Sequence, residues 1–429
     1  MRITPRPQGH HLLRGSAAVT LAVGLNGAAG FAFWWLAAWR DDASAVGAAQ
    51  ELFTAVTVVA CLTSMGLPVA VARFSPDQSA RAEAHFRDAI VYTSVTSVLG
   101  AIALTALGGG SHVHPAEVVA GPAGAAVVLS FLLVGMALAV LVEVRLMALR
   151  RWGWLITRVA LVAVIRLPLL LLDRSGRWAF LLVAGVPAIS GFIGAAALLV
   201  TRERHPAPLH PDERRAWLRF STVNWAGLMG SQGPMFLIPL IVALSVASAD
   251  YAPFYIAWAV TQMTFLLPHM IGQAYLTESS KDIEVDDRMT LHLSLGVMAV
   301  VTILAVPAGL VLGASLGPDY LIVGRLLPWL LAGCIPWAVT ASHLAKARRR
   351  HDDGAVITIT AAFFVTTLGA VGLAAPGGGV MAASQAWVVA NVVVALVATR
   401  VASSWSSVRL PRPLELDLDL DLDLEGAAR

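Results

Sequence analysis

Long apolar stretches alternate with short polar breaks along almost the whole chain. About 20 mostly apolar residues are needed for a helix to cross a bilayer. Twelve stretches are long enough, and we predict a transmembrane helix in each: 16–39, 46–72, 88–108, 122–147, 153–173, 178–201, 220–247, 252–276, 290–316, 320–345, 355–375 and 380–402. If two of the less regular stretches were shallow helices rather than spans, the count would be ten.

The composition agrees with this pattern. Of the 429 residues, 57% are hydrophobic and 13% charged, and the mean hydropathy is +0.73. Soluble domains carry about 25% charged residues, so this chain has too few charges to cover a water-facing surface. We predict an all-α polytopic membrane protein. Its net charge of +3 comes without a basic cluster interleaved with aromatic residues outside the spans, so no nucleic-acid partner is expected.

The basic residues indicate the orientation of the spans. Cytoplasmic loops carry an excess of Lys and Arg. With the N-terminus inside, all but six of the 30 Lys and Arg residues fall on the cytoplasmic side. Three of the six face the other side, Arg40, Arg174 and Arg177. The other three lie within spans, Arg158, Arg166 and Arg325. We therefore predict a multi-pass protein of the inner (cytoplasmic) membrane with both termini in the cytoplasm.

A polar, proline-containing segment divides the chain into two sets of six spans. We predict a cytoplasmic segment at 1–15 and a six-helix lobe at 16–201. A cytoplasmic linker at 202–219 leads to a second six-helix lobe at 220–402, and a disordered acidic tail follows at 403–429. Three pairs of landmarks recur at a spacing of about 200 residues, which favours a duplicated unit: Asn26 with Asn224, Pro68 with Pro268, and 146–152 with 344–351. Six spans return the chain to its starting side, so the two copies would be parallel repeats.

No constellation of catalytic residues is visible, and we predict a protein that is not an enzyme and needs no cofactor. The P-loop pattern GxxxxGK[ST] is absent. His112, His114 and Glu117 share a loop, but two histidines and a carboxylate in a flexible loop are ordinarily solvated, so no metal site is predicted. The alternating stretch 414–425, LELDLDLDLDLE, has nothing to pair with as a strand.

Arginines inside a span carry the strongest functional signal. Arg158 and Arg166 lie on one ridge of the span 153–173. An arginine at mid-membrane costs about 2.5–3.5 kcal/mol on the insertion scale, so it normally faces protein or water and meets a partner. For Arg166 the partner is either an acid of the chain, Glu143 or Asp173, or an anionic substrate, because a guanidinium binds phosphate and carboxylate in two-point contacts. Pro168 indicates a local helix irregularity beside it.

Other polar residues in the spans are weaker candidates. Glu143 either pairs with Arg158 or is a protonatable coupling site, while Arg145 beside it extends its side chain to the interface. Glu51 is the second candidate for ion coupling. Arg325 lies near the outer end of its span, and His269 is expected to be a neutral, hydrogen-bonded histidine. Four amides join helices or line a cavity: Asn26, Asn224, Gln232 and Gln262.

Several stretches resemble the multidrug/oligosaccharidyl-lipid/polysaccharide exporter superfamily, and within it the polysaccharide (O-antigen type) flippase branch. The similarity is carried by SAAVTLAVGLNGAAGFAFWWLAAW, VGAAQELFTAVTVVACLTSMGLPVAVARF, DYAPFYIAWAVTQMTFLLPHMIGQA and LGPDYLIVGRLLPWLLAGCIPWAV. The resemblance implies two helical lobes around a central cavity, alternating access, and a polyprenyl-phosphate-linked glycan held by cationic residues. Arg166, Arg158 and Arg325 fit that role by residue type and depth. The resemblance also implies coupling to an ion, H⁺ or Na⁺, and a glycan polymerase or glycosyltransferases as partners.

Two other functions remain open at this point. An ion-coupled exporter of drugs or secondary metabolites would come from the same superfamily, although a cation exporter would favour acidic residues in its spans. A membrane scaffold that docks partners through the acidic tail belongs to another class and would not transport. The lead hypothesis is a flippase for a lipid-linked oligosaccharide or polysaccharide precursor in the bilayer.

Overall fold

The computed structural model describes residues 9–75, 79–107, 121–173, 175–200, 209–279 and 287–404, and within these ranges it is helical without strands. Two elements are short 3₁₀ turns, η2 (Leu170–Leu172) and η3 (Pro318–Tyr320). The α-helices are α1 (Gly9–Arg40), α2 (Ala43–Thr63), α3 (Leu67–Phe74), α4 (Ala80–Leu107), α6 (Gly121–Ala148), α7 (Trp152–Leu169), α8 (Gly176–Val200), α9 (Pro211–Ala243), α10 (Ser248–Ser279), α11 (Asp287–Leu316), α12 (Val323–Arg349) and α13 (Asp353–Ser403). The predicted all-α membrane class is confirmed. The loop 111–117 and the stretch 414–425 lie outside the described residues.

The last helical element is a hairpin. α13 has 51 residues, about twice what a bilayer requires. Gly379 in its middle has φ 63° and ψ −158°, a conformation that is essentially restricted to glycine. The rings of Phe363 and Trp387, on either side of Gly379, lie 6.3 Å apart, and Ile359 packs with Ala398. Eleven described helices are long and apolar enough to cross a membrane, and because α13 crosses twice, the predicted twelve crossings are present.

The ends of α6 and α12 support the predicted repeat. Both helices end in a Schellman motif, in which a residue with positive φ follows the last turn and two backbone N–H groups donate back to it. The residues with positive φ are Arg150 and His351, each at 55°, and the two backbone hydrogen bonds have the same spacing at both ends. These ends are the predicted landmarks 146–152 and 344–351.

The proline landmark is less symmetric in structure than in sequence. Pro68 lies in the first turn of α3, directly after a break in which Gly66 has φ 70°. Pro268 lies inside α10, which continues through it without interruption. The second span is therefore divided into α2 and α3, whereas its counterpart is one long helix.

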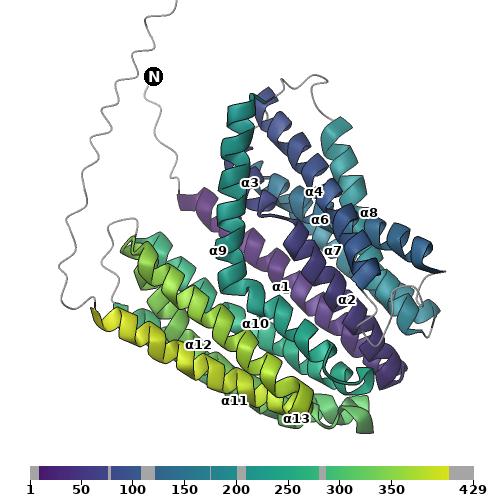
Figure 1. Ribbon diagram of the computed structural model, residues 1–429, viewed down its shortest axis with the longest axis vertical. Coiled ribbons are helices and arrows are strands. Elements are labelled where there is room, and N and C mark those ends of the chain that lie inside the picture. Colours follow the sequence, from purple (N-terminus) through teal and green to yellow (C-terminus); the bar gives the residue numbers. More distant parts are fainter. Residues whose placement is uncertain are drawn as a thin grey trace, which may run out of the picture.

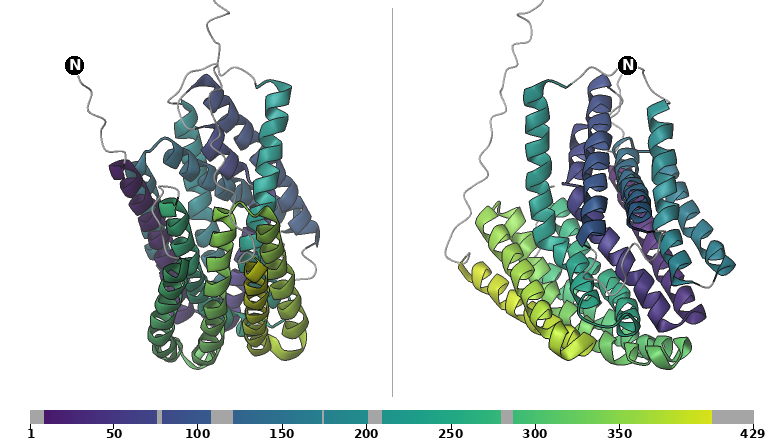
Figure 2. Two further views of the ribbon diagram at one scale, coloured as in Figure 1. Left: turned by 90° about the vertical axis from the view of Figure 1, so that its left-hand side faces the viewer. Right: turned by 45° about the vertical axis from the view of Figure 1, so that its right-hand side comes forward.

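The helices form two lobes that meet at one end of the molecule (Figure 1). The N-terminal lobe contains α1 to α8, and the C-terminal lobe contains α10 to α13 with the second half of α9. We call the side on which α6 and α12 end the basic face, and the side on which α2 and α10 begin the opposite face. The lobes are in contact at the opposite face, and α12 and α13 diverge from α4 and α8 towards the basic face (Figures 1 and 2).

Helix α9 belongs to both lobes. Its first half, which includes the end of the predicted linker, stands against α3 and α4 of the N-terminal lobe (Figure 1). There Trp217 is fully buried in a cluster with Leu67 and Phe86. Its second half packs in the C-terminal lobe, where Met235 accepts a hydrogen bond from the indole of Trp258 at 3.3 Å. The single helix α9 thus connects the two lobes.

The two lobes are packed in different ways. In the N-terminal lobe, α6 and α8 approach so closely that a Cβ on Gly135 or Gly191 would collide with the backbone of the facing helix. In the C-terminal lobe, aromatic rings fill the space between α10, α12 and α13. Phe265 and Trp337 are stacked with centroids 4.1 Å apart, and Phe363 lies 4.7 Å from Trp337.

Candidate functional site

Arg166 lies in the last turn of α7 and is buried against α1. Only 4% of the residue is exposed. Its guanidinium lies 5.9 Å from the ring centroid of Phe33, and Nη2 donates a long hydrogen bond of 3.5 Å to the backbone carbonyl of Asn26. Nε is buried without a hydrogen-bond partner among the described residues. This guanidinium is therefore only partly satisfied by the protein.

Neither acid that was considered as a partner of Arg166 pairs with it. Glu143 pairs with Arg158 instead, and Asp173 accepts a hydrogen bond from Ser175 at 3.0 Å. No carboxylate of the described ranges lies within ion-pair distance of Arg166. Of the two alternatives for Arg166, the intramolecular salt bridge is thus not formed in the part of the chain that the structure describes.

One glycine of α1 lies directly against Arg166. Gly24, Gly27 and Gly30 repeat every three residues and lie close to one face of the helix. A Cβ on Gly30 would lie 3.8 Å from Nη2 of Arg166. Small residues let transmembrane helices approach closely, so at Gly30 the backbone of α1 reaches the arginine, beside the ring of Phe33. This glycine repeat was the sequence signal for the α1–α7 contact, and the sequence analysis did not use it.

The end of α7 is held by side chains from neighbouring elements. Pro168 has no N–H group, and after it the helix tightens into the 3₁₀ turn η2. The indole of Trp178 donates to the carbonyl of Leu169 at 2.9 Å, and Arg40 donates to the carbonyls of Leu170 and Leu171. The irregularity predicted from Pro168 is present, and these contacts fix the helix end next to Arg166.

Arg158 and Glu143 form an ion pair between α7 and α6. Nη1 of Arg158 lies 2.8 Å from Oε1 of Glu143, with 12% of the arginine side chain and 37% of the glutamate side chain exposed. Two opposite charges in contact compensate each other at the membrane boundary. This arrangement supports the structural interpretation of the two residues, and their roles in substrate binding and ion coupling stay predictions.

Arg145 behaves differently from the expectation that it extends to the interface. It is fully buried, lies 3.7 Å from Glu83 of α4 and stands 5.6 Å from the ring centroid of Phe86. It also donates to the backbone carbonyl of Ser75. The reason is that α3 and α4 cover the end of α6, so the arginine finds its partners inside the protein.

Glu51 is buried where the two lobes meet. It is 4% exposed and lies on the face of α2 that also carries Gly47 and Thr54. A Cβ on Gly47 would collide with the backbone of Ser248 at the start of α10, and the hydroxyl groups of Thr54 and Tyr251 lie 2.8 Å apart. The carboxyl group of Glu51 therefore belongs to the tight α2–α10 contact at the opposite face.

The four amides and Arg325 are not gathered in one place. Gln232 and Gln262 line one pocket together with His269. Asn26 and Arg325 are exposed. Asn224 lies on the first half of α9 and donates to the carbonyl of Phe220 at 2.8 Å, away from that pocket. Of the predicted set, the structure therefore brings together only two pairs, Gln232 with Gln262 and Arg166 with the backbone of Asn26.

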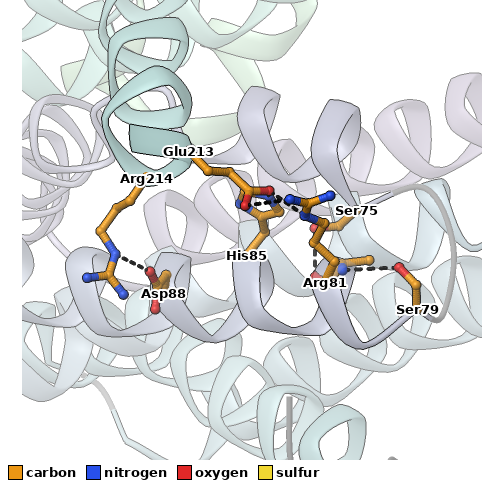
Figure 3. A network of polar contacts seen from close by, with 8 residues as sticks. Ser75, Ser79, Arg81, His85, Asp88, Glu213 and Arg214 are labelled. Atoms are coloured by element: carbon orange, nitrogen blue, oxygen red, sulfur yellow. Dashed lines mark hydrogen bonds and ion pairs between the residues drawn. The ribbon is translucent and has the colours of Figure 1, made fainter. Parts of the chain in front are cut away.

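A charged network at the basic face joins α9 to α4. Nε of Arg81 lies 2.7 Å from Oε1 of Glu213, and the same oxygen lies 3.2 Å from Nε2 of His85 (Figure 3). Nearby, Nε of Arg214 lies 2.7 Å from Oδ2 of Asp88. We call these five residues the α4–α9 latch. Sequence reasoning missed it, because residues so far apart in the chain gave no local pattern.

The fold is similar to that of solved transporters. The chain matches a lipid II flippase MurJ in an inward closed conformation with a TM-score of 0.65 and 13% identity, covering 91% of this chain and 87% of that chain. It matches two multidrug resistance MATE family transporters of the MOP superfamily. The inward-facing one gives a TM-score of 0.61 at 15% identity over 91% and 96% of the two chains; the outward-facing one gives 0.56 at 14% over 92% and 96%.

No family model matches the chain, and no curated protein matches it in sequence. Similarity in structure at this level of identity establishes the fold. The chain has the fold of these transporters. This confirms the architecture implied by the resemblance to the multidrug/oligosaccharidyl-lipid/polysaccharide exporter superfamily, and it identifies a multi-pass membrane protein. Because MATE and MurJ transporters share this fold, the fold alone does not select the substrate.

Proposed function

We propose that this protein is a transporter that moves a lipid-linked, phosphate-bearing glycan precursor across the cytoplasmic membrane by alternating access. The observation that carries the proposal is Arg166, a buried guanidinium without a carboxylate partner in the described part of the chain. A charge in that position is costly unless an anion compensates it. Phosphate oxygens match the guanidinium in two-point, charge-assisted hydrogen bonds.

The arrangement of the lobes supports the same proposal. The lobes touch at the opposite face through α2 and α10 and diverge towards the basic face (Figure 2). If the excess of Lys and Arg marks the cytoplasmic side, this is a state that loads from the cytoplasm. The contacts of the Arg166 guanidinium come from α1, at the Asn26 carbonyl, Gly30 and the Phe33 ring, so a displacement of α1 from α7 would free the guanidinium to meet a substrate.

The test is transport of a fluorescently labelled polyprenyl-pyrophosphate oligosaccharide in proteoliposomes. Arg166→Leu should lower the initial rate by about tenfold or more, as expected for a lost hydrogen bond to a charged group. It should leave the thermal stability unchanged or higher, because a buried charge is removed. Arg400→Leu, at an exposed arginine in the last turn of α13, is the matched control and should transport normally. An unchanged rate in Arg166→Leu would contradict the proposal.

Glu51 favours a second candidate, an ion-coupled exporter. A carboxyl group buried at the α2–α10 contact is placed so that its protonation would alter the strength of that contact. In the same proteoliposomes, a cationic dye replaces the lipid-linked glycan. Efflux that depends on a proton or sodium gradient and is lost in Glu51→Gln, with no transport of the glycan lipid, would favour the exporter. The scaffold is tested by deleting 411–429. A transporter should keep its activity without this segment; absence of any transport by the unaltered chain, with loss of partner docking on the deletion, would favour the scaffold.

A further inference from the structure

A pocket lies in the C-terminal lobe, between α9, α10 and α12. Its volume is about 150 Å³. Its polar lining includes Gln232, Gln262 and His269, and Phe265 and Trp337 are among its aromatic walls. An engineered protein cavity of about this size holds a benzene molecule, so the space is about as large as one six-membered ring.

The polar groups of the pocket are neutral and have unused hydrogen-bonding capacity. Nε2 of Gln262 donates to the carbonyl of Met235 at 2.8 Å, which fixes the amide and leaves its Oε1 as an acceptor. The side chains of Gln232 and His269 make no hydrogen bond to other described residues. Together they offer both donors and acceptors. No carboxylate, lysine or arginine lines the pocket.

The aromatic wall is rigid. Phe265 and Trp337 are stacked at 4.1 Å, and the indole N–H of Trp337 donates to the carbonyl of Phe265 at 3.1 Å. Binding sites commonly combine such apolar walls with a few fixed polar groups that set the orientation of the ligand. Because these side chains are already held in place, a ligand would lose little free energy in ordering them.

We propose that this pocket binds one uncharged sugar ring of the transported glycan. A sugar ring has an apolar face for the aromatic wall, and hydroxyl groups that both donate to Oε1 of Gln262 and accept from His269 or Gln232. An unsubstituted aromatic ring would fill the same space but leave those polar groups unpaired, which costs binding free energy. A cation would find no negative charge in the lining.

Helix α10, which lines the pocket, also contacts α1 next to the residue that binds Arg166. Met263 follows Gln262 on α10, and a Cβ on Gly27 of α1 would lie 3.3 Å from the methyl carbon of Met263. Gly27 in turn follows Asn26, whose carbonyl accepts the hydrogen bond from Arg166. A substrate with its phosphate at Arg166 and a sugar ring in the pocket would span the contact between α1 and α10. This pairing of sites rests on the proposed function, whereas sugar binding by the pocket does not.

The test measures binding of soluble sugars to the full-length protein in a detergent without a sugar headgroup. The probes are methyl glycosides of a hexose, an N-acetylhexosamine and a deoxyhexose, followed by tryptophan fluorescence and by calorimetry. We expect at least one to bind. Gln262→Leu should weaken its affinity by about five- to tenfold, the effect of losing a neutral hydrogen bond. Leu266→Trp, which fills the pocket without removing a polar group, should abolish binding.

The matched control is Gln385→Leu, the same substitution at an exposed glutamine of α13, which should bind as the unaltered chain does. The proposal is overturned if none of the three glycosides binds, if Leu266→Trp binds as well as the unaltered chain, or if the pocket takes a neutral aromatic compound such as indole in preference to the glycosides.

Arg166→Leu separates this inference from the proposed function. It should retain the affinity for methyl glycosides while losing transport of the polyprenyl-pyrophosphate oligosaccharide. If sugars bind but the glycan lipid is not transported by the unaltered chain, the proposed function fails and the pocket stands. If the glycan lipid is transported but Gln262→Leu and Leu266→Trp leave both sugar binding and transport unchanged, the pocket assignment alone fails.

Discussion

The two lobes have a similar arrangement of helices but differ in their interior packing and buried polar groups. The N-terminal lobe is closed by backbone contacts at Gly135 and Gly191 and buries an arginine without a nearby acid. The C-terminal lobe is filled by aromatic rings around Trp337 and Trp387 and carries a neutral polar pocket. The similar ends of α6 and α12 show that the lobes have kept the same local turns. The difference teaches that a repeated helical unit can retain its helix ends while the packing and polarity of its interior diverge.

The aromatic core gives the largest expected effect on stability. Trp387 is fully buried, and its indole N–H donates to the carbonyl of Leu330 at 3.0 Å. Trp387→Ala should lower the free energy of unfolding by about 3–5 kcal/mol, because it leaves a cavity and an unpaired carbonyl. Thermal unfolding in detergent measures the change. Trp329→Ala, at a partly exposed tryptophan of α12, is the control. An equal loss of unfolding free energy in both variants would contradict a larger contribution from the buried aromatic core.

The close contact of α6 and α8 gives the next largest effect. Gly191→Ala should destabilise the protein by about 1–3 kcal/mol, because the new Cβ meets the backbone of Gly135 and the helices must move apart. Gly185→Ala in the same helix has its nearest neighbour, a side-chain carbon of Leu132, at 3.8 Å, so it should be neutral or slightly stabilising. Equal melting temperatures for the two variants would argue against backbone packing in this lobe.

The α4–α9 latch should give the smallest effect. Arg81 is 74% exposed and Glu213 23%, and exposed ion pairs contribute at most about 1 kcal/mol. Glu213→Gln should therefore change the melting temperature little. It should nevertheless increase the separation between the start of α9 and α4, measured by electron spin resonance of labels on both helices. Asp212→Asn, at an exposed acid that does not contact α4, is the control and should leave that distance distribution unchanged.

Much of the fold follows from local sequence. The positions of the spans could be predicted because the apolar core of a bilayer requires a continuous apolar helix of fixed length. Even the hairpin at Gly379, hidden within one long helical element, follows from the two separate spans predicted at 355–375 and 380–402. The start of α9 was less well predicted. Residues 211–219 look like a polar loop, and they are helical because α3 and α4 provide a surface for Trp217.

For the candidate site, the unusual residues could be predicted from the sequence, but their partners could not. Sequence identified Arg158 and Arg166 as unusual residues on one ridge of one helix, but nothing near them in the chain shows which of the two pairs with an acid. Their different environments come from the helices that face them: α6 brings Glu143 to Arg158, while α1 brings Gly30 and Phe33 to Arg166. Likewise, nothing near Gln232 in the chain indicates that Gln262 lines the same pocket.

The sequence by itself thus determined the membrane class, the twelve crossings and the paired helix ends, because each depends on hydrophobicity or backbone conformation within a few turns. Tertiary structure alone decided which arginine is compensated by an acid, which amides share a pocket and how α9 connects the lobes. The physical reason is that charge compensation and cavity shape depend on the approach of helices far apart in the chain, and that approach is set by packing rather than by any local pattern.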